Sequence, residues 1–413
     1  MKIMRNVRGT KDLFREEIKS HERIIDIASS LSKHYGYEKV ATPIFEYAEI
    51  FDRSLGNTSD VISKEIYAFP DKSRSLLALR PEFTASIIRA YITNGWQQYL
   101  PLKLFSCGPA FRYDRPQAGR QRQFHQLNFE HLGANNAFSD AEMLKFADHL
   151  AANLGIRQDL TLELNSLGCF ESRKDYQQIL FEYFSKFVND LSEDSTKRLK
   201  TNPLRILDSK DLNDKKISID APKMDNSYTK EARRYFDEVQ NYLTKFGVHY
   251  KLNKHLVRGL DYYCHTTFEF TTDKLRSQNT VIAGGRYDGL SSMLGGPDTK
   301  AIGFASGIER IALLSNFKTQ STRQVIIITL EEKVIDYAIK LLNLLRENNI
   351  DSALELDGNV DKRLKRANKA NAKYAIFIGN DEMQNNNYKI KNLDTRFEEV
   401  QPMIKLLDII SQK

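Results

Sequence analysis

The chain changes its pattern at a polar linker, residues 318–323, and this change constrains the fold more than any other feature. After the linker, apolar strand-like segments alternate with helix-like segments, at 325–330, 332–347, 350–356, 359–370 and 374–379. Alternation of this kind predicts a small α/β domain with a largely parallel sheet. We therefore expect a separate C-terminal domain at 324–413.

Before the linker, the strands are predicted to be antiparallel. Segments 103–106 and 123–132 are strand-like, and the polar residues 114–122 between them predict a long hairpin. The segment KVATPIFEYAEIF (39–51) is also strand-like, and its Pro43 belongs at an edge, a bulge or an interface because proline cannot donate to a sheet. Antiparallel strands with intervening helices favour an α+β sheet over a doubly wound one.

The segment 169–250 differs in its predicted secondary structure from the segments on either side. Helical patterns dominate at 174–191 and 229–246, strand signals fade, and SKDLNDKKISIDAPK (209–223) is polar and irregular. We interpret 169–250 as a helical insertion into a core formed by 1–168 and 251–317.

Several classes of protein are excluded. No stretch approaches the ~18 apolar residues of a membrane helix, and the charged N-terminus lacks the apolar core of a secretory signal. The three cysteines, at 107, 169 and 264, are widely spaced and form no C-x-x-C pair, which fits a reducing cytoplasm. The histidines show no metal-ligand spacing, so no side chain is assigned to a metal. The net charge of +7 favours polyanionic partners.

The segment 105–133 is the richest in chemistry, although it contains no Gly-Lys or G-x-G phosphate loop. It carries four arginines within eleven residues, Arg112, Arg115, Arg120 and Arg122. Gln126, Asn128 and Glu130 follow on one face of the second strand. Two interpretations fit: a solvated basic hairpin, or an anion site whose guanidinium groups match phosphate oxygens and whose Phe124 stacks on a base.

Three other segments allow both a functional and a structural interpretation. In LVRGLDYYCHTTFEF (256–270), Arg258 lies beside a glycine, and Tyr262 and Tyr263 point to opposite faces if the segment is extended. In AIGFASGIERIALL (301–314), Arg310 opposes the helix dipole, which predicts an anionic partner. In LALRPEFTASIIRAYI (77–92), Glu82 is either a helix cap or a carboxylate that receives an ammonium group.

Together these motifs resemble those of the bacterial histidyl-tRNA synthetases, which are class II aminoacyl-tRNA synthetases, over nearly the whole chain. GYEKVATPIFEYAEIF resembles motif 1, FRYDRPQAGRQRQFHQ motif 2, GFASGIER motif 3, and LVRGLDYY the histidine-specific signature. GNVDKRLKRANKANAKYAIFIGNDE is similar to the middle of the anticodon-binding domain. The resemblance implies an α+β fold, with a class II antiparallel core, a helical insertion and a C-terminal α/β anticodon-binding domain.

The resemblance also implies a role for each candidate residue. ATP would be bound by Arg112, Arg120, Phe124, Arg258 and Arg310, of which Arg112, Arg258 and Arg310 would be catalytic. Histidine would be bound by Glu82, Phe83, Thr84, Gln126, Glu130, Tyr262 and Tyr263. The tRNA acceptor end would contact Arg115 and Gln117, and Pro43 would lie in the interface of a homodimer.

The activity implied is ligation of L-histidine to tRNA(His) with ATP, accompanied by Mg²⁺, through histidyl-adenylate. One alternative is a non-catalytic regulatory paralogue of the ATP phosphoribosyltransferase complex in histidine biosynthesis. Such paralogues typically lack the C-terminal domain and the signature arginine, whereas this chain has residues 324–413 and Arg258. The other is an RNA-binding scaffold, suggested by the basic run 362–373, but it does not explain the residues at the substrate positions.

Overall fold

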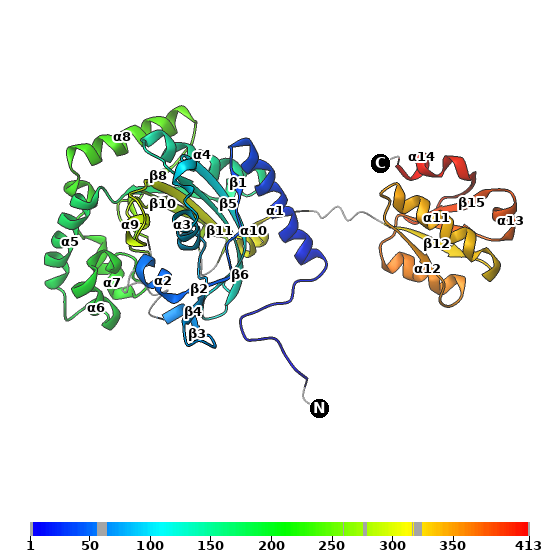
Figure 1. Cartoon of the computed structure of the whole chain (residues 1–413), viewed down its shortest axis with the longest axis horizontal. Helices are drawn as coiled ribbons and strands as arrows, with labels where there is room; N and C mark the ends of the chain where they lie inside the picture. Colours follow the sequence, from blue (N-terminus) through cyan, green and yellow to red (C-terminus); the bar gives the residue numbers. More distant parts are fainter. Residues whose placement is uncertain are drawn as a thin grey trace. The chain divides into compact units, whose positions relative to one another are not determined.

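The structure is a computed structural model that describes residues 3–55, 64–258, 260–275, 279–315, 317 and 324–411. The chain divides into two compact units, 1–317 and 318–413, and each is described by itself (Figure 1). Among the described residues, no helix has both the length and the apolar character needed to cross a membrane.

An eight-stranded sheet forms the centre of the first unit. Its strands, in spatial order, are β1 (Glu38–Lys39), β5 (Leu102–Phe111), β6 (Gln123–Leu132), β11 (Ala301–Gly307), β10 (Thr280–Arg286), β9 (Cys264–Thr271), β7 (Thr161–Ser166) and β8 (Lys251–Leu252). The pairs from β5 to β7 are antiparallel, whereas β1 and β8 pair in parallel at the two ends. The antiparallel core and the hairpin expected from the sequence are confirmed.

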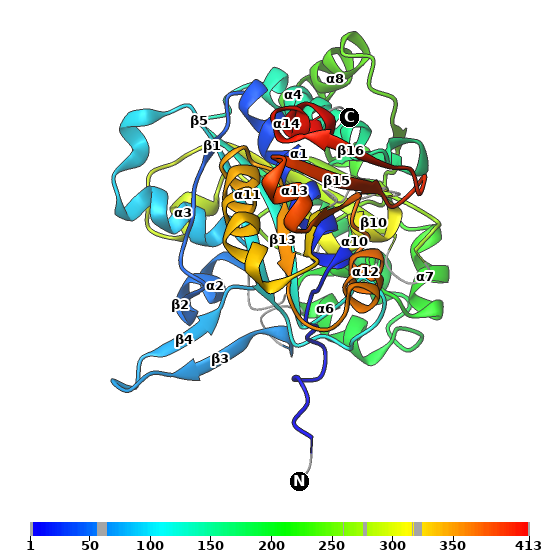
Figure 2. The same ribbon diagram turned by 90° about the vertical axis from the view of Figure 1, so that its right-hand side faces the viewer.

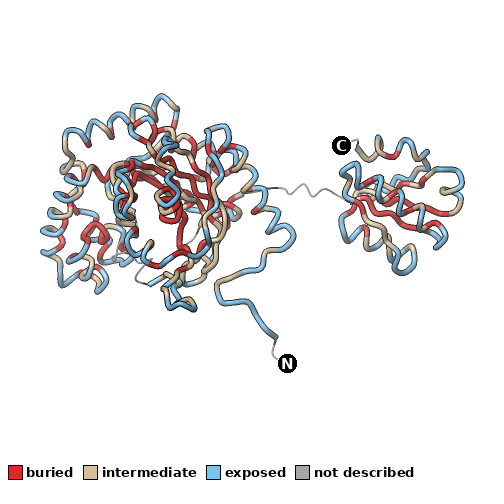
Figure 3. The backbone as a smooth tube through the Cα atoms, viewed as in Figure 1, coloured by how far each residue is buried: buried red, intermediate tan, exposed pale blue. Residues whose placement is uncertain are grey.

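Helices cover both faces of this sheet, and the buried residues concentrate along its central strands (Figure 3). One face packs against α1 (Glu16–His34), α4 (Ala137–Asn153), α8 (Lys230–Lys245) and α10 (Ile308–Leu314). The sequence builds α1 on an apolar stripe in which Ile24, Ala28 and Leu31 are buried. The other face packs against α2 (Ala48–Leu55), α3 (Thr84–Thr93), α9 (Leu290–Met293) and the part of the insertion that precedes α8.

The strand expected at 39–51 is only partly correct. The segment contains β1, then β2 (Phe45–Tyr47), which joins β4 (Leu76–Leu79) and β3 (Tyr67–Pro70) in a small antiparallel sheet. From Ala48 onward the chain is helical, because Ala48 and Phe51, three residues apart, are both buried on one side of α2. Pro43 lies between β1 and β2, and its carbonyl accepts a hydrogen bond from Arg80 at 3.4 Å.

The insertion contains α5 (Phe170–Ser185), α6 (Glu193–Thr201), α7 (Leu212–Ile219), α8 and the short turns η4 (Pro203–Ile206) and η5 (Met224–Ser227). The irregular structure expected at 209–223 is wrong, because α7 lies there. Its polar residues serve the fold: Asp211 caps α7. Buried Asp214 accepts hydrogen bonds from the hydroxyls of Ser192, Ser195 and Ser209, each at 2.6 Å.

The second unit has a five-stranded sheet in the order β13 (Ser352–Glu355), β12 (Val325–Thr329), β14 (Tyr374–Ile378), β15 (Asn387–Asn392) and β16 (Glu398–Pro402). The first three strands are parallel, as expected, and the last two add antiparallel strands. Helix α11 (Ile335–Glu347) covers one face and α12 (Val360–Lys369) the other (Figure 2). Two short helices, α13 (Asn380–Gln384) and α14 (Leu406–Ser411), complete the unit.

Candidate active site

A cavity of about 380 Å³ opens on the face of the large sheet that carries α3. It brings together most of the expected substrate residues, namely Glu82, Thr84, Arg112, Arg120, Phe124, Gln126, Arg258, Tyr262, Tyr263 and Arg310. Glu130 contacts this lining from behind, through Thr84 and Tyr287. Segments that lie far apart in the sequence therefore form one site.

Three of the expected contact residues, Phe83, Arg115 and Gln117, lie outside the cavity lining. Phe83 is 1% exposed and packs in the core of the first unit, with the guanidinium of Arg80 3.9 Å from its ring centroid, so it is not part of the cavity wall. Arg115 and Gln117 lie in the loop between β5 and β6, outside the lining, where Gln117 pairs with Arg120.

Gln126 of β6 lies on the floor of the cavity, and Asn128 and Glu130 continue the polar row behind it. Gln126, Asn128 and Glu130 are all buried, and they share one face of the strand as the alternation predicts. Glu130 lies opposite Gly303 on β11, and a β-carbon at position 303 would overlap the Glu130 carboxylate. Glycine at this position therefore leaves room for the carboxylate on the sheet face.

Glu130 is 1% exposed and accepts hydrogen bonds from Thr84 Oγ1 at 2.5 Å, from Asn128 Nδ2 at 3.0 Å and from the Tyr287 hydroxyl. Burial raises the pKa of Glu130 to about 7, although these donors lower it. The sequence analysis missed Tyr287, whose only signal was its place after the glycine pair in TVIAGGRYDGL.

Tyr287 is held in place by its neighbour Arg286, at the end of β10. Arg286 is 1% exposed and pairs with Asp140 of α4, and its Nη1 donates to the Ala134 carbonyl at 2.7 Å and to Asp288 at 2.9 Å. Burial alone would lower the pKa of Arg286, but Asp140 raises it above its usual value. The charged pair therefore fixes the end of the strand from which Tyr287 reaches Glu130.

Tyr262 and Tyr263 both face the cavity, with ring centroids 4.6 Å apart. The expectation that they point to opposite faces is wrong, because residues 261 and 262 form a turn instead of an extended strand. Burial raises the pKa of both phenols, so they are neutral hydrogen-bonding groups at physiological pH.

Arg258 forms a half-buried ion pair with Glu269 of β9, which also accepts a hydrogen bond from Thr280 Oγ1 at 2.6 Å. Burial alone would lower the pKa of Arg258, but Glu269 raises it above its usual value. The guanidinium therefore keeps its charge inside the cavity.

Three further cations, Arg112, Arg120 and Arg310, line the same cavity. Arg112 donates to the Pro81 carbonyl at 3.0 Å and lies 5.4 Å from the centroid of the Phe124 ring. Arg310 donates to the carbonyls of Gly119 and Thr280 at 3.1 and 2.6 Å. The pKa of Arg310 is lowered to about 10, mainly by burial and to a smaller extent by repulsion from Arg112 and Arg120. Such crowding of cations is relieved by a bound polyanion.

Glu82 serves the fold and also lines the cavity. Its carboxylate accepts from the backbone N–H groups of Thr84 at 2.6 Å and Ala85 at 2.8 Å, at the first turn of α3. Burial raises the pKa of Glu82, and these donors lower it. Both interpretations of this residue from the sequence are therefore compatible with its position.

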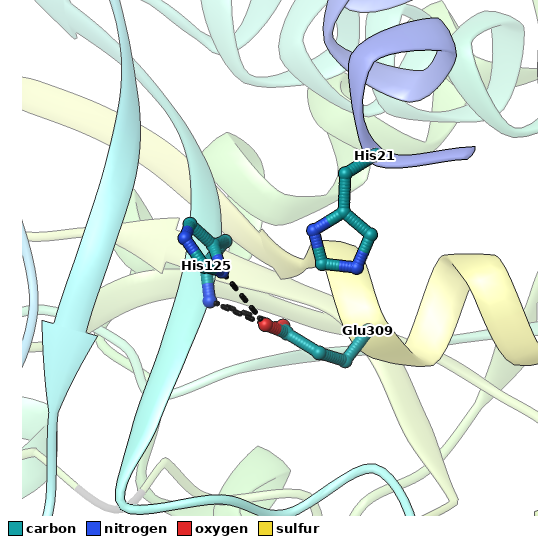
Figure 4. Close-up of side chains that lie close together, drawn as sticks. All are labelled: His21, His125 and Glu309. Atoms are coloured by element: carbon teal, nitrogen blue, oxygen red, sulfur yellow. Dashed lines mark hydrogen bonds and ion pairs between the residues drawn. The ribbon is translucent and has the colours of Figure 1, made fainter. Parts of the chain in front are cut away.

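His21, His125 and Glu309 form a cluster that the sequence spacing did not reveal, because they come from α1, β6 and α10 (Figure 4). Their ligand-type atoms lie within 4.8 Å of one another. The backbone N–H of His125 donates to both Glu309 oxygens, at 2.9 and 3.0 Å, and its ring Nδ1 lies 2.9 Å from Oε1. The carboxylate thus joins β6 to the start of α10.

Comparisons with known proteins agree with this architecture. The family model described as Histidyl-tRNA synthetase matches residues 9–311, and that described as Anticodon binding domain matches 324–413. The chain is 53% identical to "Histidine--tRNA ligase" of Rickettsia bellii and 52% identical to that of Rickettsia akari, each over 98% of both chains. The crystal structure of apo histidyl-tRNA synthetase from S. aureus superposes with a TM-score of 0.84 at 33% identity, covering 99% of this chain and 100% of that one.

The fold and the site thus define an α+β protein with the antiparallel core of a class II synthetase. The chain belongs to the histidyl-tRNA synthetase family.

Proposed function

We propose that the chain ligates L-histidine to tRNA(His) in two steps, through a histidyl-adenylate formed with ATP. The observation that carries the proposal is the pairing, within one cavity, of a cluster of half-buried arginines with a buried polar pocket around Glu130. The relatives named histidine–tRNA ligase are 53% and 52% identical over 98% of the chain. This similarity does not favour the alternative, a regulatory paralogue of the ATP phosphoribosyltransferase complex.

ATP would lie along the arginine side of the cavity. Arg112 and Arg258 would stabilise the negative charge that develops at the α-phosphate, Arg310 would bind the γ-phosphate, and Phe124 would stack on the adenine. Arg120, which pairs with Asp114 and Glu65, would close this side. Adenylation is an in-line displacement that depends on positioned cations more than on a general base, and ATP would enter as its Mg²⁺ complex.

Histidine would lie on the floor formed by β6. Gln126 Oε1 is buried and has no hydrogen-bond partner among the described residues, so it offers an acceptor to the α-ammonium group beside Glu82 and Thr84. Glu130 and Tyr263 would pair with the two imidazole nitrogens, with Tyr262 packed beside them. Leaving such buried polar groups unpaired disfavours look-alike amino acids by about 10⁴-fold.

The tRNA would contact both units. Arg115 and Gln117 lie in the loop beside the cavity, where the acceptor end must arrive. In the second unit, Lys362, Lys365 and Lys369 are exposed on α12, which suits a phosphate backbone.

We also propose a homodimer that forms around Pro43. Ile44, Phe45 and Tyr47, which follow it, are large apolar residues exposed at 42%, 55% and 61%, and such a patch marks an interaction surface.

Cys107, Cys169 and Cys264 form no disulfide, which supports a cytoplasmic location.

The test of the activity is ATP–pyrophosphate exchange by the purified chain over all standard amino acids with Mg²⁺, followed by charging of tRNA(His). Exchange with histidine alone is expected. If the folded protein exchanges with no amino acid, the proposed activity is overturned and binding to a phosphoribosyltransferase becomes the next measurement.

A further inference from the structure

Two side chains of the helical insertion reach back to the turn that carries the tyrosines of the site. Arg173, in the first turn of α5, donates its Nη1 to the carbonyls of Asp261 at 2.7 Å and Tyr263 at 2.9 Å. Asn202, which follows α6, donates its Nδ2 to the Asp261 carboxylate at 2.8 Å. The insertion is therefore hydrogen-bonded to the backbone and to a side chain of this turn.

These hydrogen bonds are built into the fold. Asn202 is 6% exposed, and its Oδ1 accepts from Gln177 Nε2 of α5 at 3.3 Å, which fixes the orientation of the amide. Burial lowers the pKa of Arg173, and the carboxylate of Asp261 raises it. A half-buried charged donor with two carbonyl acceptors holds a backbone firmly, because charge-assisted hydrogen bonds are stronger than neutral ones.

The turn needs such support because no sheet holds it. Residues 261 and 262 form a turn, and strand pairing of β9 begins only at Cys264. Yet Tyr262, Tyr263 and, a few residues earlier, Arg258 all line the cavity. The positions of these groups thus depend on contacts from outside the sheet.

We propose that Arg173 and Asn202 are positioning residues through which the insertion sets the geometry of the histidine site. The inference rests on the proposed function, since it assigns Tyr263 to the imidazole. It implies that any change in the placement of the insertion alters the affinity for histidine. ATP binding should be affected less, because Arg112 follows β5, Phe124 lies in β6 and Arg310 lies in α10. Of the proposed ATP contacts, Arg258 alone lies near this turn.

The first test is steady-state pyrophosphate exchange by the full chain with Arg173→Gln. We expect the KM for histidine to rise roughly tenfold, and the KM for ATP to change less than about threefold, since removing the hydrogen bonds of a charged donor weakens only the site they position. Arg173→Lys, which keeps one charged donor, should recover part of the loss. The matched control is Arg233→Gln, another arginine of the insertion, which donates to the Asp225 carbonyl within the insertion. Equal KM values for histidine in Arg173→Gln and Arg233→Gln would overturn the proposal.

The second test swaps the donor and the acceptor of the hydrogen bond between residues 202 and 261. Asn202→Asp places two carboxylates in contact and should raise the KM for histidine. Adding Asp261→Asn restores a donor opposite an acceptor and should return the KM toward that of the wild type. If the double variant is no better than Asn202→Asp while both melt like the wild type, the hydrogen bond does not position the site.

A third measurement does not depend on catalysis. Amide hydrogen exchange in peptides covering 260–267 should be faster in Arg173→Gln than in the wild type and in Arg233→Gln. This measurement separates the two proposals. A chain that shows no ATP–pyrophosphate exchange would overturn the proposed function, whereas unchanged amide protection in Arg173→Gln would overturn the positioning role.

Discussion

The Thr84 hydroxyl donates a 2.5 Å hydrogen bond to the Glu130 carboxylate, joining the first turn of α3 to the middle of the sheet. Because Asn128 and Tyr287 donate to the same carboxylate, Glu130 is surrounded by donors although it is fully buried. The hydrogen bonds stabilise the charged form of Glu130, whereas burial destabilises it. This balance makes the residue sensitive to pH.

The stability of the first unit should depend on the ionisation of Glu130. Its pKa is about 7 in the folded chain, against 4.5 for an ordinary glutamate. Between these values the folded chain holds a proton that the unfolded chain has released, so the free energy of unfolding falls as pH rises from 4.5 to 7. The shift corresponds to about 3 kcal/mol, and Glu130→Gln should lack this loss.

Urea unfolding at pH 4.5, 6 and 7.5 measures this effect. Trp96, the single tryptophan, lies in the first unit and reports its unfolding by fluorescence. Glu231→Gln, at an exposed position of α8, is the control and should unfold with the pH profile of the wild type. Parallel profiles for the wild type and Glu130→Gln would contradict the prediction.

Gly303→Ala should impair histidine binding more than ATP binding. The added methyl group would displace the Glu130 carboxylate, and forced repacking of this kind costs about 1–3 kcal/mol, or roughly tenfold to a hundredfold in the KM for histidine. Exchange kinetics give both KM values. Gly289→Ala is the control, because the nearest atom to its added methyl group is Met293 Cε at 3.9 Å. A KM for histidine equal to that of Gly289→Ala would refute the assigned role of the glycine.

Arg258→Ala should slow adenylation far more than it weakens histidine binding. Loss of a positioned cation at the developing charge typically costs about 10²–10³ in rate. The measurements are single-turnover formation of the adenylate and histidine binding by calorimetry. Arg258→Ala combined with Glu269→Gln controls for the half-buried carboxylate that the single variant leaves without its ion pair. Equal losses in rate and in binding would argue against the role.

Substitution of Lys362 and Lys365 by alanine should weaken tRNA binding and reduce its salt dependence. Each lysine that no longer neutralises a phosphate should lower the slope of log K against log salt by roughly 0.7–0.9. The neighbouring Arg363 and Arg366 serve as controls, because they bind the Thr329 carbonyl and Glu355 within the domain. Their replacement should lower the stability of the domain and change the salt slope less than the lysine substitutions do. An unchanged salt slope in the lysine variant would show that α12 does not bind the RNA.

The sequence predicted the elements whose periodicity matches their burial. Helix α1 agrees with the structure because its apolar residues lie on one buried face, whereas β12 agrees because it is an apolar run buried along its whole length. The hairpin of β5 and β6 agrees because a polar segment separates its two strands. Helix α7 was missed because its stability comes from polar residues: Asp211 caps it and buried Asp214 collects three hydroxyls, which resembles a loop in composition. Helix α2 was missed because it begins at Ala48, directly after β2, so that no turn residue marks the boundary between the two elements.

Most site residues could be predicted because they lie in recognisable motifs, but the ways in which they pair with one another could not. Tyr287 reaches Glu130 across 157 residues of sequence, and the hydrogen bond between Glu309 and His125 spans 184. Phe83 was placed in the site because it stands between two residues that line it, yet the first turn of α3 directs its ring into the core. Proximity in sequence was misleading where a helix begins.

Arg286 and Tyr287 are neighbours in the chain but serve opposite sides of the sheet. The arginine is locked to Asp140 of α4, and the tyrosine reaches the pocket floor. A shift of α4 would therefore be transmitted, through one peptide bond, to Tyr287 and its hydrogen bond with Glu130. Under the proposed function, substitutions in α4, which supplies none of the described residues of the cavity lining, would then change how well the site distinguishes histidine from other amino acids.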